Sequence, residues 1–228
     1  MDEKEKEIRL LNCEFRVADA EKREIEGTAI FFNQWSPVRY EEFKEMILPD
    51  AVEGVIEGSD IKFLYNHDTS KGFLARNNKG KGTLKIEVKE DGVHFRFKCK
   101  KDNLSNYVWE RLESGELDEM SFAFTIAEDE WRKTADGYWE RIIKRFDKLY
   151  DFSVVDTSFY GVENAVKCKR FAEVQEEDRK AIEKAQEEER LQKEKEEQEK
   201  REQEEAEKQK ALDDYYKKVR EENAKYLK

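Results

Sequence analysis

The sequence predicts a mainly β body with a few helices, an α+β fold, followed by a long charged C-terminal helix. The first observation behind this expectation is a series of short apolar segments with turn signals between them, which fills the first 170 residues. The second is an abrupt change of composition near Phe171, because every Trp, Phe, Gly and Pro lies at or before that residue. We therefore expect two domains, residues 1–170 and 171–228.

The body offers strand patterns from its beginning to its end. Asp91-Gly92 is typical of a hairpin turn, and Asp136-Gly137 gives a second turn signal of the same kind. Residues Lys62 to Tyr65 form an apolar run that ends at His67. The other expected strands are Ile8–Val17, Ile25–Phe32, Thr83–Val88, Val93–Cys99, Met120–Ile126 and Leu149–Val155.

Two helices are expected between these strands. One is short and opens at Pro49-Asp50-Ala51-Val52, where Pro suits the first turn. The other runs from about Leu104 to Ser114 and ends at Gly115, a residue type that favours the position after a helix. Many strands with two inserted helices indicate a closed or nearly closed β-barrel.

The C-terminal segment has the composition of an exposed helix. From Glu173 to Lys210 it has no Gly or Pro, and opposite charges recur three or four residues apart. Because a sustained heptad of apolar residues is missing, we interpret it as an extended, solvent-exposed helix or as partial disorder, and not as a self-sufficient coiled coil. Residues 211–227 are amphipathic and predict a docking face, with helix self-association as the alternative. The apolar stripe consists of Leu212, Tyr215, Tyr216, Val219 and Tyr226.

Composition also limits the classes of partner. Asp and Glu number 55 against 44 Lys and Arg, a net charge of -11, which argues against a general nucleic-acid binder. The three cysteines are far apart and indicate reduced thiols, with neither a disulfide framework nor a metal site. The charged first six residues argue against a signal peptide, and no apolar run reaches the ~20 residues of a membrane span. We expect a soluble, intracellular protein with no cofactor, no metal, no nucleic acid and no membrane partner.

Three side chains are of the types that nucleophilic catalysis needs. His67 is one of two histidines in the chain, and imidazole is the usual proton carrier near neutral pH. Ser121 and Asp151 each interrupt an apolar segment, where a hydroxyl or a carboxylate needs a partner. Each residue also has a structural interpretation: a turn cap for His67, a bond to a neighbouring carbonyl for Ser121, and a solvent-facing strand edge for Asp151. Sequence separation alone does not show whether they converge.

Five short segments follow one another in a recognisable order. They are Gly27-Thr28-Ala29-Ile30-Phe31-Phe32, the run from Phe43 to Val52, Asn66-His67-Asp68, the run from Gly115 to Phe124, and Leu149-Tyr150-Asp151-Phe152-Ser153-Val154-Val155. In this order they resemble the HK97-type prohead maturation proteases of tailed bacteriophages, which are related in fold to the herpesvirus assembly proteases. The resemblance covers roughly residues 8 to 168.

This resemblance implies a herpesvirus-protease-like β-barrel with Ser121 as nucleophile, His67 as general base and Asp151 as the acid that orients His67. It implies a serine endopeptidase inside the assembling procapsid, in the host cytoplasm. The implied substrates are the major capsid protein, a scaffold protein and the protease itself, and a homo-oligomer is a further option. The alternative is a non-catalytic capsid-assembly scaffold or chaperone with a β-barrel head and a helical stalk.

The chain departs from the family pattern at two places. Ala123 stands where the family often has Gly, and Asp156-Thr157-Ser158-Phe159 follows the last motif, where the family often has a Pro-Ala pair. The oxyanion hole is therefore left unassigned.

Four other residues of catalytic type rank lower. The second histidine, His94, precedes the serine, whereas the herpesvirus relatives place their second histidine after it, so we interpret His94 as structural. Ser153 lies inside an apolar strand pattern and is also interpreted as structural. Nothing in the sequence around Cys99 favours a thiolate, and Asp68 is given only a secondary role in orienting a loop.

Overall fold

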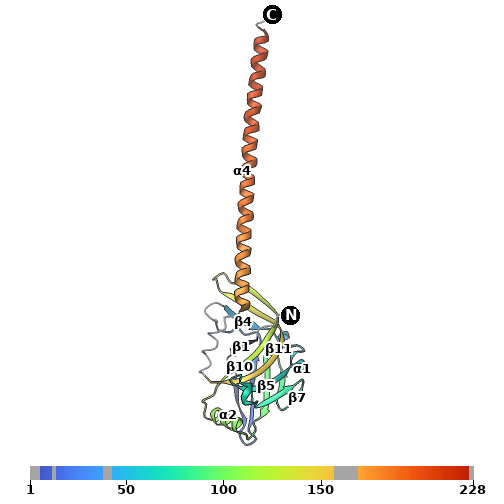
Figure 1. The fold of residues 1–228 in the computed structure, drawn as a ribbon, viewed down its shortest axis with the longest axis vertical. Helices are drawn as coiled ribbons and strands as arrows, with labels where there is room; N and C mark the ends of the chain where they lie inside the picture. The colour runs from blue at the N-terminus through green and yellow to red at the C-terminus, as the bar shows by residue number, and fades with distance from the viewer. Residues whose placement is uncertain (1–5, 12–13, 38–42, 157–168, 226–228) are drawn as a thin grey trace. The chain divides into compact units, whose positions relative to one another are not determined.

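The computed structural model describes residues 6–11, 14–37, 43–156 and 169–225 (Figure 1). Its contacts divide the chain into two compact units, Met1–Cys168 and Lys169–Lys228. The first unit mixes many strands with a few short helices, and the second is a long helix. The predicted α+β fold with a long C-terminal helix is therefore confirmed.

The described strands of the body form two sheets. The seven-stranded sheet has the order β1-β10-β11-β5-β6-β7, and β4 also pairs with β11. The four-stranded sheet has the order β2-β3-β9-β8. The larger sheet consists of β1 (Glu7–Leu11), β4 (Phe43–Ile47), β5 (Asp60–Tyr65), β6 (Ala75–Asn78), β7 (Lys81–Gly82), β10 (Glu119–Lys133) and β11 (Trp139–Val155). The smaller consists of β2 (Glu14–Asp19), β3 (Glu24–Phe31), β8 (Lys85–Val88) and β9 (Gly92–Lys98).

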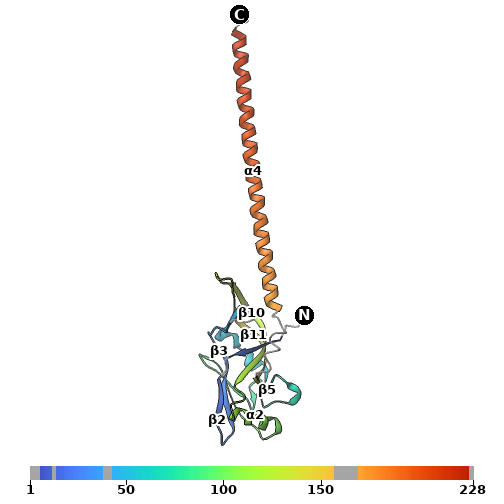
Figure 2. The ribbon, with the colours of Figure 1, turned by 90° about the vertical axis from the view of Figure 1, so that its left-hand side faces the viewer.

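The core lies between the two sheets. Phe63 of β5 packs against Phe95 and Phe97 of β9, with ring centroids 4.9 and 4.6 Å apart. Phe95 also lies 6.3 Å from Phe152 of β11. Aromatic burial of this kind is a main source of stability in a small body, and here it joins the two sheets into one barrel-like unit. In Figure 2 strands β2 and β3 stand on one side of this unit and β5 on the other.

Strands β10 and β11 form a hairpin that is longer than the sequence predicts. The predicted strands end at Ile126 and begin at Leu149, whereas the pairing continues outward to Lys133 and Trp139. The turn falls where it was predicted, with Gly137 at a φ of 86°, a conformation that favours glycine. Several register shifts bend the hairpin, so that β11 pairs in parallel first with β4 and then with β5.

The predicted turn at Asp91-Gly92 lies between β8 and β9, but glycine is needed there for a different reason. Lys89 and Gly92 exchange backbone hydrogen bonds of 2.8 and 3.3 Å, which makes Glu90 and Asp91 the central residues. A Cβ atom at Gly92 would lie 2.2 Å from the carbonyl oxygen of Ile30 on β3. The glycine therefore permits a close approach of two strands.

Both predicted helices of the body are present, with small differences. The first is a 3₁₀-helix, η1, and a one-turn α-helix follows it. The second is α2, whose N-terminal amides are capped by Asp102, because its carboxylate accepts from the backbone N–H of Ser105 at 2.8 Å. Gly115 follows the helix with a φ of 74°, as expected for a C-terminal stop. The bounds are η1 (Pro49–Val52), α1 (Val55–Gly58), η2 (Thr69–Lys71) and α2 (Asn103–Glu113).

A buried cluster of charges joins four strands of the larger sheet. The guanidinium of Arg141 on β11 is fully buried and binds both oxygens of Glu7 on β1, at 2.6 and 2.8 Å. It also donates to Asp129 on β10 at 2.9 Å and lies 3.5 Å from Glu45 on β4. Arg9 pairs with Glu7 and Glu45 and completes the cluster. Buried charges need such partners, so this cluster ties the N-terminal strand to the hairpin.

The second unit is α4 (Lys169–Lys225), drawn in orange to red in Figure 1. Its 57 residues correspond to a length of about 85 Å. Exposed ion pairs three or four residues apart run along it, such as Glu187 with Arg190 and Glu197 with Arg201. The amphipathic segment 211–227 is helical in its backbone to residue 225, but its side chains and Tyr226 lie outside the described residues. None of the helices that the structure describes combines the length and the apolar character needed to cross a membrane.

Candidate active site

The site lies on three neighbouring strands, β10, β11 and β5. In the antiparallel pair Ser121 is directly opposite Ser153, and Ala123 is opposite Asp151. Residues opposite each other, and residues two apart on one strand, share a face of the sheet. Ser121, Asp151 and Ser153 therefore share one face, while the alternate residue Phe152 packs into the aromatic core.

His67 reaches this face from a tight turn at the end of β5. Asn66 and His67 both have left-handed backbones, with φ of 54° and 56°. Asn and His are among the non-glycine residues that adopt this region most readily. The backbone N–H of Asn66 donates to the carbonyl of Val154 at 2.9 Å, and that of Asp68 donates to Tyr65 at 3.1 Å. The turn thus redirects the chain over the end of β11.

Asp156 holds the turn from the far end of β11. Its carboxylate accepts from the hydroxyl of Tyr65 at 2.9 Å and from the side-chain amide of Asn66 at 3.1 Å. Its backbone N–H donates to the Asn66 side-chain oxygen at 3.1 Å. Asp156 is the first residue of the segment that stands where the family often has a Pro-Ala pair. It therefore supports the turn that carries His67. The rest of that departure, residues 157–159, lies outside the described residues.

The structure brings together the three side chains that the sequence singled out. The distance from His67 Nε2 to Ser121 Oγ is 2.7 Å, and that from His67 Nδ1 to Asp151 Oδ1 is 2.5 Å. Ser121 and Asp151 are each 2% exposed, and the His67 side chain is 5% exposed. These contacts form one chain of hydrogen bonds, from hydroxyl to imidazole to carboxylate, in a site largely screened from water.

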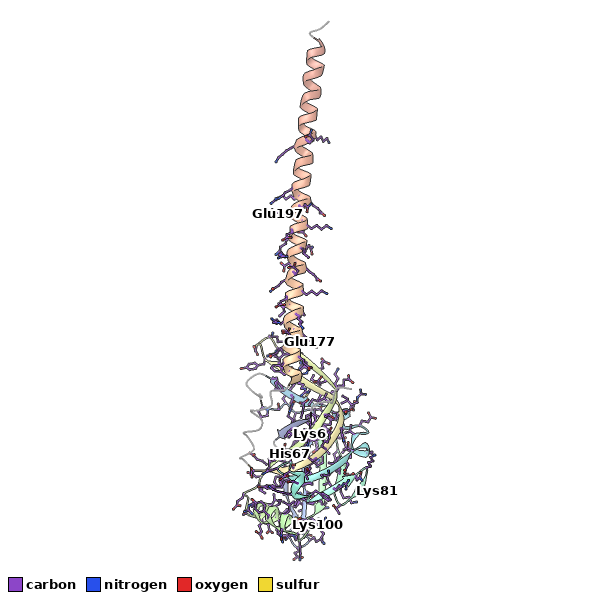
Figure 3. All side chains as sticks on the ribbon, in the orientation of Figure 1. Lys6, His67, Lys81, Lys100, Glu177 and Glu197 are labelled. Carbon is purple, nitrogen blue, oxygen red and sulfur yellow. The ribbon has the colours of Figure 1, made fainter. Side chains whose placement is uncertain are left out.

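Asp151 is held in its ionised form by its surroundings. Burial opposes its charge, but the hydrogen bond and charge of His67, together with Lys6 and Ser153, outweigh it and lower the pKa of Asp151. Lys6 Nζ lies 3.3 Å from Asp151 Oδ2, the oxygen that does not face His67. Lys6 and His67 are both labelled on the body in Figure 3. An ionised carboxylate in this position favours the proton on Nδ1 and leaves Nε2 to accept from Ser121.

Three of the four lower-ranked candidates, His94, Cys99 and Asp68, are engaged with other partners. His94 is on β9 in the smaller sheet, where its ring nitrogens contact Thr28 Oγ1 at 3.1 Å and Asp91 Oδ1 at 2.8 Å. Cys99 is buried, and burial raises the pKa of its thiol, which opposes a reactive thiolate. Asp68 caps η2 by accepting a backbone N–H. In the part of the chain that the structure describes, no group of three or more His, Cys, Asp or Glu is arranged to hold a metal ion.

A hydroxyl, an imidazole and a carboxylate in this order are the arrangement of nucleophilic hydrolases, the class that the site resembles. A family model for the caudovirus prohead serine proteases matches residues 11–177. Because the match covers more than half of the chain, the chain belongs to this family. It is a prohead protease by family, and the resemblance noted in the sequence is confirmed.

Two other comparisons concern the curated proteins and the solved structures. A search of the curated proteins found no match. Among solved structures, the capsid assembly protease of bacteriophage T4 is similar, with a TM-score of 0.41 and 11% sequence identity. The similarity covers 66% of this chain and 98% of that one.

The structure adds contacts of Asp151 with Lys6 and Ser153 that the sequence did not specify. Lys6 was grouped with a charged N-terminus, and nothing in its position indicates a contact with a residue 145 positions away. Ser153 was interpreted as structural, although it lies two residues after Asp151 in an expected strand. That spacing puts both side chains on one face and was a usable signal.

Proposed function

We propose that this prohead protease is a serine endopeptidase in which Ser121 is the nucleophile, His67 the general base and Asp151 the acid that orients His67. The observation that carries the proposal is the hydrogen bond from Ser121 Oγ to His67 Nε2, with Asp151 on the other ring nitrogen. Membership of the prohead serine protease family supports it independently. The proposed substrates are the capsid or scaffold protein and the protease itself, inside the assembling procapsid.

In the first half of the reaction, His67 Nε2 takes the proton of Ser121 Oγ as that oxygen attacks the peptide carbonyl carbon. The resulting tetrahedral intermediate collapses when the C–N bond breaks. The leaving amine takes the proton from Nε2, and the acyl group stays on Ser121. Asp151 remains ionised throughout and stabilises the imidazolium that forms in passing.

In the second half, water attacks the acyl carbon and gives a proton to His67 Nε2. The bond to Ser121 Oγ then breaks, and Nε2 returns its proton to that oxygen. The carboxylic acid product leaves, and the site is restored. Two of the four proton transfers, from Ser121 Oγ to Nε2 and back, run along the hydrogen bond of 2.7 Å between these atoms. The other two run between Nε2 and the leaving amine or the attacking water, so the same ring nitrogen serves all four.

Ser121→Ala is the direct test. We expect peptide hydrolysis and processing of the capsid or scaffold protein to fall by about four to six orders of magnitude. Ser59→Ala is a matched control, because Ser59 is also a buried serine and its hydroxyl accepts one backbone N–H, that of Leu149 at 3.3 Å. The control should keep nearly full activity. Unchanged processing by the Ser121 variant would favour the non-catalytic scaffold instead.

A serine-reactive phosphonate tests the nucleophile and its activation together. Mass spectrometry of the labelled chain should locate the adduct on Ser121. His67→Ala should suppress labelling although the serine is still present, because the base that activates it is gone. Labelling at another serine, or undiminished labelling without His67, would contradict the assignment.

A further inference from the structure

A fourth side chain is built into the proposed triad. Ser153 is fully buried and lies on β11 between the two neighbouring strands of the site. Its Cα partner on β10 is Ser121, and its partner on β5 is Leu64. The hydroxyl is therefore enclosed between the strand of the nucleophile and the strand that leads to His67.

All hydrogen-bonding positions of this hydroxyl are used within the site. Ser153 Oγ donates to Asp151 Oδ1 at 2.9 Å. It accepts from the backbone N–H of His67 at 3.2 Å and lies 3.2 Å from His67 Nδ1. A hydroxyl has one donor and two acceptor positions. With Nδ1 protonated, Ser153 makes one bond to the acid and one to the backbone of the base. Its second acceptor position faces the single Nδ1 proton, which is shared with Asp151 Oδ1 at 2.5 Å.

These bonds fix two features of the site on which proton transfer depends. One is the backbone of His67, and the other is the carboxylate oxygen that faces its ring. The bond to the His67 backbone holds a residue whose φ of 56° is a left-handed conformation. The bond to Asp151 Oδ1 fixes the oxygen that faces Nδ1, while Oδ2 is left to Lys6. Together they set the direction of the imidazole ring, and hence the line from Nε2 to Ser121.

We infer that Ser153 is a positioning residue for the reaction: it fixes both the backbone of the base and the carboxylate oxygen that the base faces. The inference rests on the proposed triad. Ser153 is not a rival nucleophile, because its hydroxyl lies on the Nδ1 side of the ring and donates to Asp151, whereas Nε2 faces Ser121. It touches none of the reacting atoms and acts through His67 and Asp151.

Two substitutions in the full-length chain separate positioning from simple packing. Ser153→Ala removes the hydroxyl, and Ser153→Cys keeps a side chain of similar size that hydrogen-bonds weakly. We expect both variants to lose about 10- to 100-fold in kcat with little change in KM, because the substrate still binds but the base is misaligned. The control Ser59→Ala, which loses a comparable hydroxyl contact elsewhere, should leave kcat unchanged.

Proton NMR supplies a readout that packing alone would not move. The Nδ1 proton shared by His67 and Asp151 should give a far-downfield signal that moves or broadens in Ser153→Ala and Ser153→Cys and stays in place in Ser59→Ala. Full activity in Ser153→Cys with a lost signal only in Ser153→Ala would show a space-filling role and overturn the inference.

The inference and the proposed function fail in different ways. If Ser121→Ala remains active, the triad itself is wrong. If Ser121→Ala is inactive while Ser153→Ala keeps full kcat and an unmoved Nδ1 signal, the triad stands and only the positioning role falls.

Discussion

Two ion pairs, one in the body and one in the C-terminal helix, use charged residues in opposite ways. In the body, Arg141 is fully buried and pairs with Glu7, which is 134 residues away in the sequence. In α4, Arg201 pairs with Glu197 one turn away, and its side chain is 74% exposed. Buried pairs between distant strands fix the register of a fold, whereas exposed pairs within one helix support only local structure. Charge content alone therefore says little about what a charged residue does.

The largest effect is expected where burial and chemistry coincide. Asp151→Asn keeps the shape of the side chain but removes the charge that holds the proton on Nδ1 of His67. We expect kcat to fall by about 10⁴-fold with the fold intact, measured by peptide hydrolysis and by circular dichroism. Glu197→Gln makes the same kind of change on α4 and should leave kcat untouched. Comparable losses of kcat in the two variants would contradict this difference between the body and α4.

Arg141→Met tests the buried cluster. The variant leaves Glu7, Glu45 and Asp129 around an apolar side chain, so three buried carboxylates each lose a cationic partner. We expect a loss of about 3–5 kcal/mol in the free energy of unfolding of the body, measured by denaturant titration. A loss below about 1 kcal/mol would mean that water reaches the cluster, which would then resemble the exposed pairs of α4.

The dependence of the unfolding midpoint on pH should show what the buried charge of Asp151 contributes to the stability of the body. The pKa of Asp151 is lowered in the folded body from its ordinary value of 3.8. The stability that this carboxylate contributes is therefore complete above pH 3.8. It is lost as the pH falls through the lower pKa of the folded state. Unfolding midpoints measured at decreasing pH should fall less steeply in Asp151→Asn than in the parent chain. An identical pH profile for the two proteins would contradict the lowered pKa.

The smallest effect is expected on α4. Arg201→Ala removes one ion pair between exposed side chains, and such pairs within a helix contribute about 0.2–0.5 kcal/mol. Helix content measured by circular dichroism should change only slightly, and added salt should reduce the difference between the two proteins. A large loss of helix would mean that this pair contributes far more than an exposed pair within a helix.

Removal of the residues after Gln175 tests the role of α4. We propose that it serves as a scaffold-like or encapsidation element, a role motivated by its composition. The truncated chain should hydrolyse peptides as the full chain does but should no longer be packaged into procapsids, as measured in assembled particles. Normal packaging of the truncated chain would exclude this role.

The resemblance seen in the sequence named the three side chains that converge in the candidate site, but not the contacts around them. His67, Ser121 and Asp151 stand in short motifs whose order resembles a known family, and each is a polar residue in an apolar context. The role of Arg141 was not predictable, because its partners lie on strands whose register cannot be read from local patterns. The hairpin of β10 and β11 was predicted too short because the outer part of β10, residues 127–133, is mostly polar and lacks an apolar alternation. The outer part of β11 is more apolar, with Trp139, Ile142 and Ile143, but it does not alternate regularly either.

The parallel pairing of β5 with β11 has a consequence for when the site can form. It joins residues 62–65 to residues 151–154, so the loop between the partners contains most of the body. Closing a loop of that length has an entropic cost that the final packing must offset, which makes such pairings slow and late steps of folding. A growing chain on the ribosome therefore holds His67 long before it holds Asp151. On our proposed function, proteolytic activity would begin only after the body is complete, and the newly made chain would carry no active site.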